Sequence, residues 1–159
     1  MGERKHVFLT DLLGILAAEG VGALSGWLTR DAVKTYSTRI KQPPLSPPPL
    51  VFPVVWGVLF ALMGVGAARI WRAPPSRERT RGLALFGIQL AFNFGWSLLF
   101  FNLQAFGGAF LWLLVLWALI LWMLLTFRKV DKKAAWLQIP YLLWVSFAAY
   151  LNLGVWLLN

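Results

Sequence analysis

The sequence of 159 residues contains no cysteine and a single histidine, His6, close to its N-terminus. The absence of cysteine excludes disulfide bonds, thiolate catalysis and cysteine-ligated metal sites. A lone histidine at the edge of an apolar run is best interpreted as an end residue. No pairing of a nucleophile with a base is visible, and no cluster of residues has metal-ligand spacing. Conventional hydrolytic or metal-dependent chemistry is therefore not indicated.

Charged residues are also scarce. They make up 13% of the chain, against about 25% in a typical soluble domain. Hydrophobic residues account for 59% of the sequence, and ten tryptophans and twelve phenylalanines stand among them. The charges gather in short clusters that separate long uncharged runs. This pattern predicts a polytopic membrane protein. The net charge of +9 then reflects topology and contact with anionic lipids, so we expect no nucleic-acid partner.

Five runs are long enough to cross a membrane, which takes about 20 mostly apolar residues. We predict one transmembrane domain over residues 1–159, an all-α bundle with a long proline-rich first loop. Its helices are expected near 7–28, 50–71, 82–101, 106–127 and 134–158. The connections are then 29–49, 72–81, 102–105 and 128–133. Short connections join antiparallel neighbours, which favours an up-and-down bundle.

Basic residues predict the orientation of this bundle. Eleven of the fifteen lie on the side that holds the N-terminus, and the other four, Arg30, Lys34, Arg39 and Lys41, lie on the opposite side. The positive-inside rule places the richer side in the cytoplasm. We therefore expect a cytoplasmic N-terminus and a C-terminus on the opposite side.

The third predicted helix has two distinct faces. Helical periodicity brings four residues into one polar and aromatic stripe: Gln89, Asn93, Trp96 and Phe100. Small residues form a second stripe roughly opposite: Ala84, Gly87, Ala91 and Gly95. Because small residues let helices approach closely in lipid, we expect a homodimer interface there, with packing inside the bundle as the alternative. Asn93 alone could equally form an interhelical hydrogen bond.

Tryptophans on two other helices are expected in or near the same half of the membrane. Trp56 near the start of the second span and Trp144 on the fifth lie in the same half of the membrane as Asn93 and Trp96. Above that half lies the first connection, where six of the nine prolines fall within residues 43–53. Proline reduces the entropy that a loop loses when it is ordered. The pattern indicates a stiff lid over an aromatic pocket between spans 1, 2, 3 and 5, with a rigid linker as the alternative.

These residues resemble the translocator protein family, also described as tryptophan-rich sensory or peripheral benzodiazepine receptor-like proteins. The run KQPPLSPP ending at Pro48, with Tyr36 before it and VFPVVW ending at Trp56 after it, resembles the family's first-loop signature. NFGWS and FF in the third span, and PY, W, FA and LN in the fifth, resemble its helix motifs. The chain departs from the pattern by one extra residue between Tyr36 and Pro43 and by Leu45, where many members have tryptophan.

The resemblance implies five transmembrane helices, usually dimeric, and a pocket beneath the first loop. Such pockets bind porphyrins, including protoporphyrin IX, and synthetic isoquinoline-carboxamide or benzodiazepine ligands. Carried over by position, and with Phe100 added from its stripe, the ligand-binding residues are Tyr36, Pro47, Trp56, Asn93, Trp96, Phe100, Trp144, Ala148 and Leu151. Trp56 and Trp144 match the tryptophans implicated in light-dependent porphyrin breakdown by bacterial relatives. They are our candidate catalytic residues.

Three functions remain open at this point. The first is a porphyrin sensor or scavenger that needs no cofactor and binds no metal. The second is a slow porphyrin-degrading enzyme at the same site. The third is lipid or sterol transport, or a structural role. Sterol binding is disfavoured because Tyr150 is followed by LNLGVWLLN, without the basic residue of the family's sterol motif. Glu19, an acid within the first span, fits helix packing or a proton relay.

Overall fold

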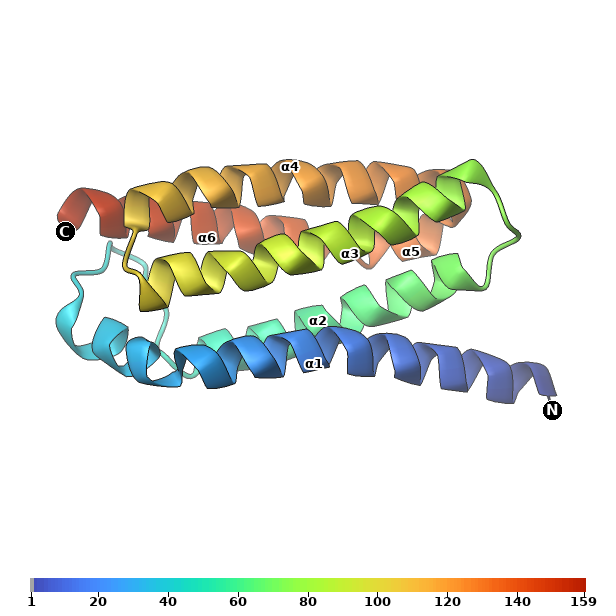
Figure 1. Cartoon of the computed structure of the whole chain (residues 1–159), viewed down its shortest axis with the longest axis horizontal. Helices are drawn as coiled ribbons and strands as arrows, with labels where there is room; N and C mark the ends of the chain where they lie inside the picture. Colours follow the sequence, from blue (N-terminus) through green and yellow to red (C-terminus); the bar gives the residue numbers. More distant parts are fainter. Residues whose placement is uncertain (1) are drawn as a thin grey trace.

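The computed structural model describes residues 2–159, and every regular element among them is helical (Figure 1). Five segments are long and apolar enough to cross a membrane, which confirms the predicted five-helix membrane fold. The elements, in chain order, are α1 (Gly2–Arg39), α2 (Val51–Trp71), α3 (Arg77–Ser97), a π-helical turn η1 (Leu98–Asn102), α4 (Phe106–Val130), α5 (Lys132–Trp136) and α6 (Ile139–Leu158).

The first predicted helix and the first connection have the wrong boundaries. α1 continues to Arg39, so residues 29–39 are helical and only residues 40–50 connect α1 to α2. The hydroxyl groups of Thr35, Ser37 and Thr38 each donate to a carbonyl one turn earlier, at 3.5, 3.0 and 2.9 Å. These bonds satisfy the three hydroxyl groups on the helix itself, so the side chains do not interrupt its backbone hydrogen bonds. The polar end of α1 therefore extends the helix beyond its apolar span.

The last predicted helix is divided in two. α5 ends at Trp136 and α6 begins at Ile139, with Pro140 in its first turn. Proline is accommodated there because the first helical residues have no intrahelical partner for an amide hydrogen. The third span ends in the π-helical turn η1, which carries Phe100 and Phe101. Neither the break nor the π turn was expected from the sequence.

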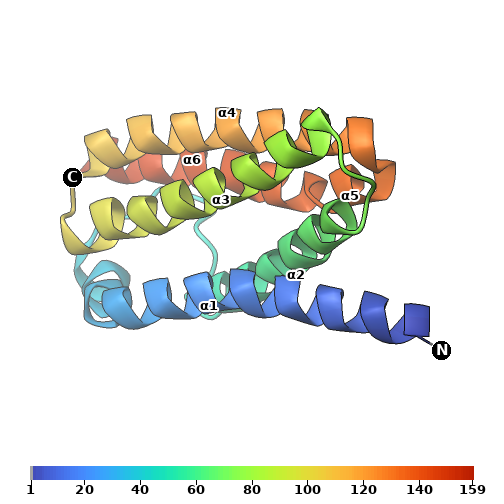
Figure 2. The same cartoon turned by 45° about the vertical axis from the view of Figure 1, so that its right-hand side comes forward.

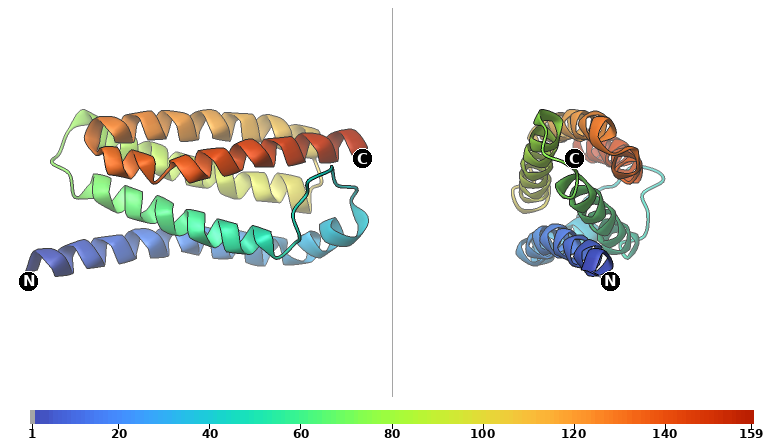
Figure 3. Two further views of the ribbon diagram at one scale, coloured as in Figure 1. Left: turned by 180° about the vertical axis from the view of Figure 1, so that it is seen from behind. Right: turned by 90° about the vertical axis from the view of Figure 1, so that its right-hand side faces the viewer.

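The long helices run along one common axis, with the two termini at opposite ends (Figure 1). α3, α4 and α6 group together, whereas α1 lies along one side of the bundle (Figure 2). α2 runs obliquely and, seen end-on, lies between α1 and the other helices (Figure 3). This arrangement leaves α1 and α2 facing α3 and α6 near the end that holds the C-terminus.

The connection 40–50 is fastened to the C-terminal end of α6. The Tyr150 hydroxyl donates to the Pro44 carbonyl at 2.6 Å. Asn159 bonds the backbone of Lys41 twice, accepting from its amide at 3.2 Å and donating to its carbonyl at 2.8 Å. Pro43 packs against Gly154, where a Cβ atom would approach the proline ring to 2.5 Å. The proline-rich segment is thus fixed at three points above the bundle.

Two ion pairs hold the opposite end together. Arg72 of α2 contacts Asp11 of α1 at 2.7 Å, and Arg69 of α2 contacts Asp131, the N-cap of α5, at 2.8 Å. All four side chains are partly accessible. Exposed pairs of this kind contribute about 0–1 kcal/mol each, so their main effect is to fix the relative positions of α1, α2 and α5.

Candidate functional site

A cavity of about 730 Å³ lies at the loop end of the bundle, between α1, α2, the α3–η1 segment and α6. The structure places all nine predicted ligand-binding residues in its wall: Tyr36, Pro47, Trp56, Asn93, Trp96, Phe100, Trp144, Ala148 and Leu151. Gln42, Pro47 and Pro49 bring the first connection into the lining. The predicted position beneath that connection therefore corresponds to a real cavity, and α4 contributes nothing to its wall.

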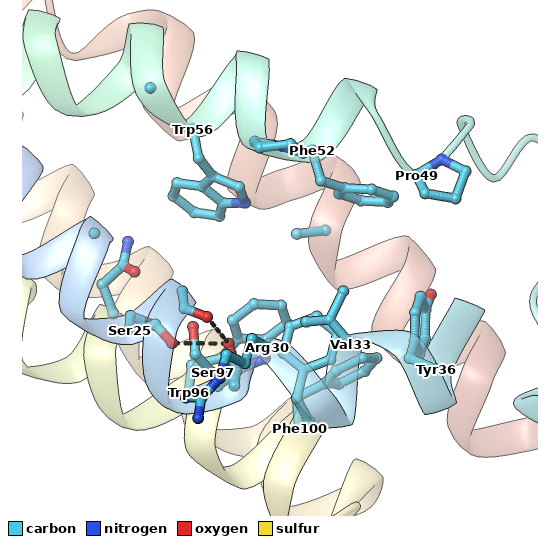
Figure 4. Close-up of a pocket in the computed structure, with 18 of the residues that line it drawn as sticks. Ser25, Arg30, Val33, Tyr36, Pro49, Phe52, Trp56, Trp96, Ser97 and Phe100 are labelled. Carbon is cyan, nitrogen blue, oxygen red and sulfur yellow. Dashed lines mark hydrogen bonds between the residues drawn. The ribbon is translucent and has the colours of Figure 1, made fainter. Parts of the chain in front are cut away.

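Two aromatic surfaces face each other across the cavity (Figure 4). Phe52 and Trp56 project from α2 on one side. On the other side the rings of Trp96 and Phe100 are stacked, with centroids 5.1 Å apart. Tyr36 of α1 joins that second surface, because its ring lies 5.4 Å from that of Phe100. The space between the two surfaces suits a flat, largely apolar ligand.

The Trp96 indole is held in place by hydrogen bonds from its own surroundings. Its Nε1 donates to Oδ1 of Asn152 at 2.9 Å, and Asn152 Nδ2 donates to the Phe106 carbonyl at 2.8 Å. These bonds connect α3, α6 and the start of α4. The aromatic surface that contains Trp96 is therefore fixed before any ligand binds.

Trp144 differs from Trp96 in its polar contacts. Its ring lies 6.1 Å from that of Phe52, yet its buried Nε1 has no hydrogen-bond partner among residues 2–159. A buried donor without an acceptor costs about 1–3 kcal/mol. Trp56 contacts Phe60 at 5.6 Å and the Tyr141 ring at 6.2 Å. The two candidate redox tryptophans both border the cavity, and each packs against aromatic rings of its own.

Two basic side chains, Arg30 and Lys34, line the cavity from α1. Arg30 donates to the Trp27 carbonyl, and its guanidinium lies 4.5 Å from the Trp27 ring centre. Arg39 and Lys41, the other two basic residues predicted on this side of the membrane, are exposed and do not line the cavity. Positive charge therefore reaches the cavity from the last turns of α1 rather than from the proline-rich segment.

The contribution of α1 was largely missed in the sequence. Its lining residues follow helical spacing: Glu19, Gly22, Gly26, Arg30, Val33 and Ser37. The periodicity is present in the sequence, but the polar residues 29–39 are typical of a connection, and that prediction hides the second half of the stripe. Glu19 is the first residue of this stripe, about three helical turns before Arg30. Its side chain makes no ion pair or hydrogen bond within the described part of the chain.

The stripe of small residues on α3 is not uniform. Ala84, Gly87 and Ala91 are exposed on the surface of the bundle, and a Cβ atom on Gly87 would meet nothing within 4 Å. Gly95 instead packs against Trp112 of α4, where an added Cβ atom would come within 2.8 Å of the indole. Gly95 therefore serves packing within the bundle, and only the first three positions remain open to a second chain.

Comparison with known proteins gives one consistent result. A model of the TspO/MBR family matches residues 14–157. The chain is 37% identical to the tryptophan-rich protein TspO of Chlorobaculum tepidum, over 95% of this chain and 96% of that protein. It is also 37% identical to the translocator protein of Ovis aries, over 74% of this chain and 70% of that protein. The tryptophan-rich sensory protein of Cereibacter sphaeroides is 32% identical over 92% of the chain and 90% of its own length.

Proposed function

The chain belongs to the TspO/MBR family, and we propose that it is a membrane receptor that binds porphyrins in the cavity between α1, α2, α3 and α6. Five spanning helices and family membership establish an integral membrane protein. Porphyrin binding is our inference from the shape and chemistry of the cavity. In the cell, such a protein would act as a sensor or scavenger of free porphyrin.

The pair of opposed aromatic surfaces is the observation that carries this proposal. A porphyrin presents two large π faces, and the cavity offers Phe52 and Trp56 to one face and Trp96 and Phe100 to the other (Figure 4). Each aromatic contact contributes about 0.5–1.5 kcal/mol beyond the area that it buries. The volume of about 730 Å³ falls within the range of about 300–1,000 Å³ typical of ligand pockets.

Two basic residues of the lining could bind the carboxylates at the edge of such a ligand. Protoporphyrin IX carries two propionates on one edge. Arg30 and Lys34 lie one helical turn apart on the α1 face of the cavity, close enough to contact carboxylates of a single ligand. The site needs no cofactor for this function, and synthetic isoquinoline-carboxamide or benzodiazepine compounds would compete for the same aromatic surfaces.

Titration with protoporphyrin IX tests the proposal. Stoichiometric porphyrin should quench tryptophan fluorescence and shift the Soret band of the bound pigment. Trp56→Ala should weaken binding, whereas Trp122→Ala should not, because Trp122 lies on α4, is 52% exposed and does not line the cavity. Binding no tighter than to an unrelated five-helix membrane protein would refute porphyrin recognition.

A second candidate is slow, light-dependent degradation of porphyrin at this same site. The proximity of two oxidisable tryptophans to the cavity favours it, since Trp56 and Trp144 both line the space that the pigment would fill. Dioxygen would be the oxidant and the illuminated pigment the photosensitiser. Loss of Soret absorption with formation of a defined product would indicate this activity, whereas a sensor would leave the pigment intact apart from ordinary bleaching.

We further propose that the chain inserts with its N-terminus in the cytoplasm. The cluster on residues 128–133, with four basic side chains, would then be cytoplasmic, and the proline-rich connection would be external. Because the chain has no cysteine of its own, single introduced cysteines can report the topology. Ser76→Cys should be protected from an impermeant thiol reagent in intact cells, and Ser46→Cys should be labelled. Labelling of Ser76→Cys and protection of Ser46→Cys would show the opposite topology.

A further inference from the structure

Residues 128–133, which join α4 to α5 and which we call the basic turn, carry four basic side chains: Arg128, Lys129, Lys132 and Lys133. All four are exposed. None of them forms an ion pair or lies over an aromatic ring within residues 2–159. The basic turn lies at the end of the bundle away from the C-terminus (Figure 1), and no residue of it lines the cavity. Its positive charges are therefore available to a partner outside the chain.

The one acidic residue of the basic turn does not neutralise these charges. Asp131 Oδ2 accepts a hydrogen bond from Arg69 Nε of α2 at 2.8 Å. Its Oδ1 accepts from the Lys133 amide at 3.0 Å and so caps α5. Both carboxylate oxygens are thus used inside the protein, and Arg69 balances their charge. The four exposed cations remain unopposed.

Other basic groups are more strongly engaged by their own chain. At the same end of the bundle, Arg79 donates to the Trp71 carbonyl through Nε and Nη2, at 3.2 and 2.9 Å. Its guanidinium also lies 5.0 Å from the centre of the Trp71 ring. At the loop end, Trp27 holds Arg30 in a similar way. Among residues 2–159, the basic turn therefore holds the largest group of neighbouring cations that lack such a partner.

Exposed tryptophans flank the basic turn on both sides. On α4, Trp122 and Leu125 share a helical face with Lys129, and they are 52% and 47% exposed. On α5, Trp136 lies about one helical turn after Lys132 and is 73% exposed. Exposed tryptophans of spanning helices typically lie at the level of the lipid head groups. Both helices therefore enter the membrane surface next to the basic turn.

The depth of these residues places the cations at the phosphates of a bilayer. At about 1.5 Å per residue, the basic turn extends roughly 6 to 10 Å beyond the two tryptophans along the helix axes. Lysine and arginine suit this position, because their aliphatic stems pack on apolar surface while their charged ends stay in the polar layer. Cations above an apolar flank fit a membrane lipid better than a soluble anion.

We propose that the basic turn is a binding site for an anionic phospholipid. The head-group phosphate contacts Lys129 and Lys132, which lie on two helices that pack against each other. An acyl chain of the same lipid packs along Leu125 and Trp122. Clusters of about four to eight basic residues directly beside a spanning helix are typical of such sites. The site shares no residue with the cavity, so this inference goes beyond the proposed function and does not depend on it.

Lipid titration in a neutral detergent tests the proposal whatever the orientation of the protein in a membrane. Phosphatidylglycerol and phosphatidylcholine with identical acyl chains are added to the full chain, and bound lipid is counted by native mass spectrometry. The test variant carries Lys129→Gln and Lys132→Gln. The matched control carries Arg39→Gln and Lys41→Gln, which removes the same charge from exposed residues at the opposite end of the bundle.

A second control carries Arg77→Gln and Arg81→Gln, two exposed cations of α3 at the same end as the basic turn. The wild type and both controls should bind phosphatidylglycerol in preference to phosphatidylcholine. The test variant should lose affinity for phosphatidylglycerol by about fivefold for each cation removed, and its affinity for phosphatidylcholine should not change. Added salt should reduce the preference of the wild type, because accessible charges are screened.

Equal affinity of the wild type for the two lipids would overturn the proposal. A loss in either control as large as that in the test variant would also overturn it, because the effect would then follow net charge alone. Displacement of phosphatidylglycerol by equimolar inorganic phosphate would show an anion site that does not require lipid, which is a third contrary result. If the test variant does not fold, Arg128→Gln with Lys133→Gln replaces it and should show the same loss. Protoporphyrin IX binding, measured on the same samples, should be unchanged in both pairs.

Discussion

Gly14 of α1 and Gly64 of α2 bring the backbones of their helices into direct contact. A Cβ atom on either glycine would overlap the backbone of the other. Nearer the loop end, Gly22 of α1 admits only the ring of Phe60 from α2, which an added Cβ atom would approach to 2.5 Å. α1 and α2 therefore touch through their backbones at Gly14 and Gly64 and through the Phe60 ring at Gly22, and residues of both helices line the cavity.

The variant Gly64→Ala should separate α1 from α2. Its methyl group would overlap the backbone of Gly14, which cannot move without shifting the helix. Overpacking of this kind typically costs about 1–3 kcal/mol, so we expect lower resistance to unfolding in mixed detergent and weaker ligand binding. Gly20→Ala is the control, because a Cβ atom on Gly20 meets nothing within 4 Å. Equal stability of the two variants would contradict the close contact.

A second prediction concerns assembly and uses two glycines of one helix. Gly87→Leu should weaken a homodimer while leaving ligand binding nearly intact, because the position is open and lies outside the cavity wall. Gly95→Leu should instead destabilise the monomer, since its side chain would collide with Trp112. Light scattering in detergent and energy transfer between labelled chains in bilayers would measure dimerisation, and thermal unfolding in detergent would measure the stability of each variant. A fully dimeric Gly87→Leu variant would exclude this interface.

The basic residues of the cavity wall give a third prediction. Neutralising Arg30 and Lys34 together, as Arg30→Gln and Lys34→Gln, should lower the affinity for protoporphyrin IX more than for its dimethyl ester. Ion pairs that remain accessible contribute about 0–1 kcal/mol each, so the expected difference is at most about thirtyfold. Raising the salt concentration should reduce it, because exposed charges are screened.

The control for that experiment neutralises the two neighbouring basic residues. Arg39 and Lys41 belong to the same basic region of the sequence but lie outside the cavity wall. Their double glutamine variant should discriminate between acid and ester as the wild type does. If all four residues act equally, or if acid and ester lose affinity together, the charges serve insertion and topology rather than recognition.

Much of the cavity could be predicted from the sequence because helical periodicity and chain direction are local properties. The spacing of Asn93, Trp96 and Phe100 determines which face of α3 they share. The order of the spans places Trp56 and Trp144 in or near one half of the membrane. These two constraints are sufficient to bring residues from three separate helices around one space.

Other features depend on contacts that no local pattern encodes. The position of Arg30 was missed because hydroxyl and charged residues after position 28 resemble a loop, although in the helix the hydroxyl groups bond its carbonyls. Gln89 and Asn93 were placed on one face, but their common partner Tyr141 is 52 and 48 residues away. Gly95 had the same small size as Gly87, and only the position of Trp112 separates their roles.

The last prediction concerns Trp144 and light-dependent chemistry. Trp144→Phe keeps an aromatic ring beside Phe52 but removes the indole, which is easily oxidised, and its N–H group. That N–H bonds nothing within residues 2–159, so its loss should not destabilise the fold. We expect porphyrin affinity to remain within about tenfold of the wild type, or 1.4 kcal/mol. If the indole is a redox partner, illuminated porphyrin should disappear more slowly.

Binding and photochemistry must be measured on the same samples, by fluorescence quenching in the dark and by Soret absorption under illumination. Trp56→Phe and the double variant extend the series, because Trp56 lines the cavity and contacts the Tyr141 ring at 6.2 Å. Trp122→Phe controls for the loss of a tryptophan that lies outside the cavity wall. If the single and double cavity variants all degrade the pigment as fast as this control, the redox role fails, and Trp56 and Trp144 act as walls of a binding site.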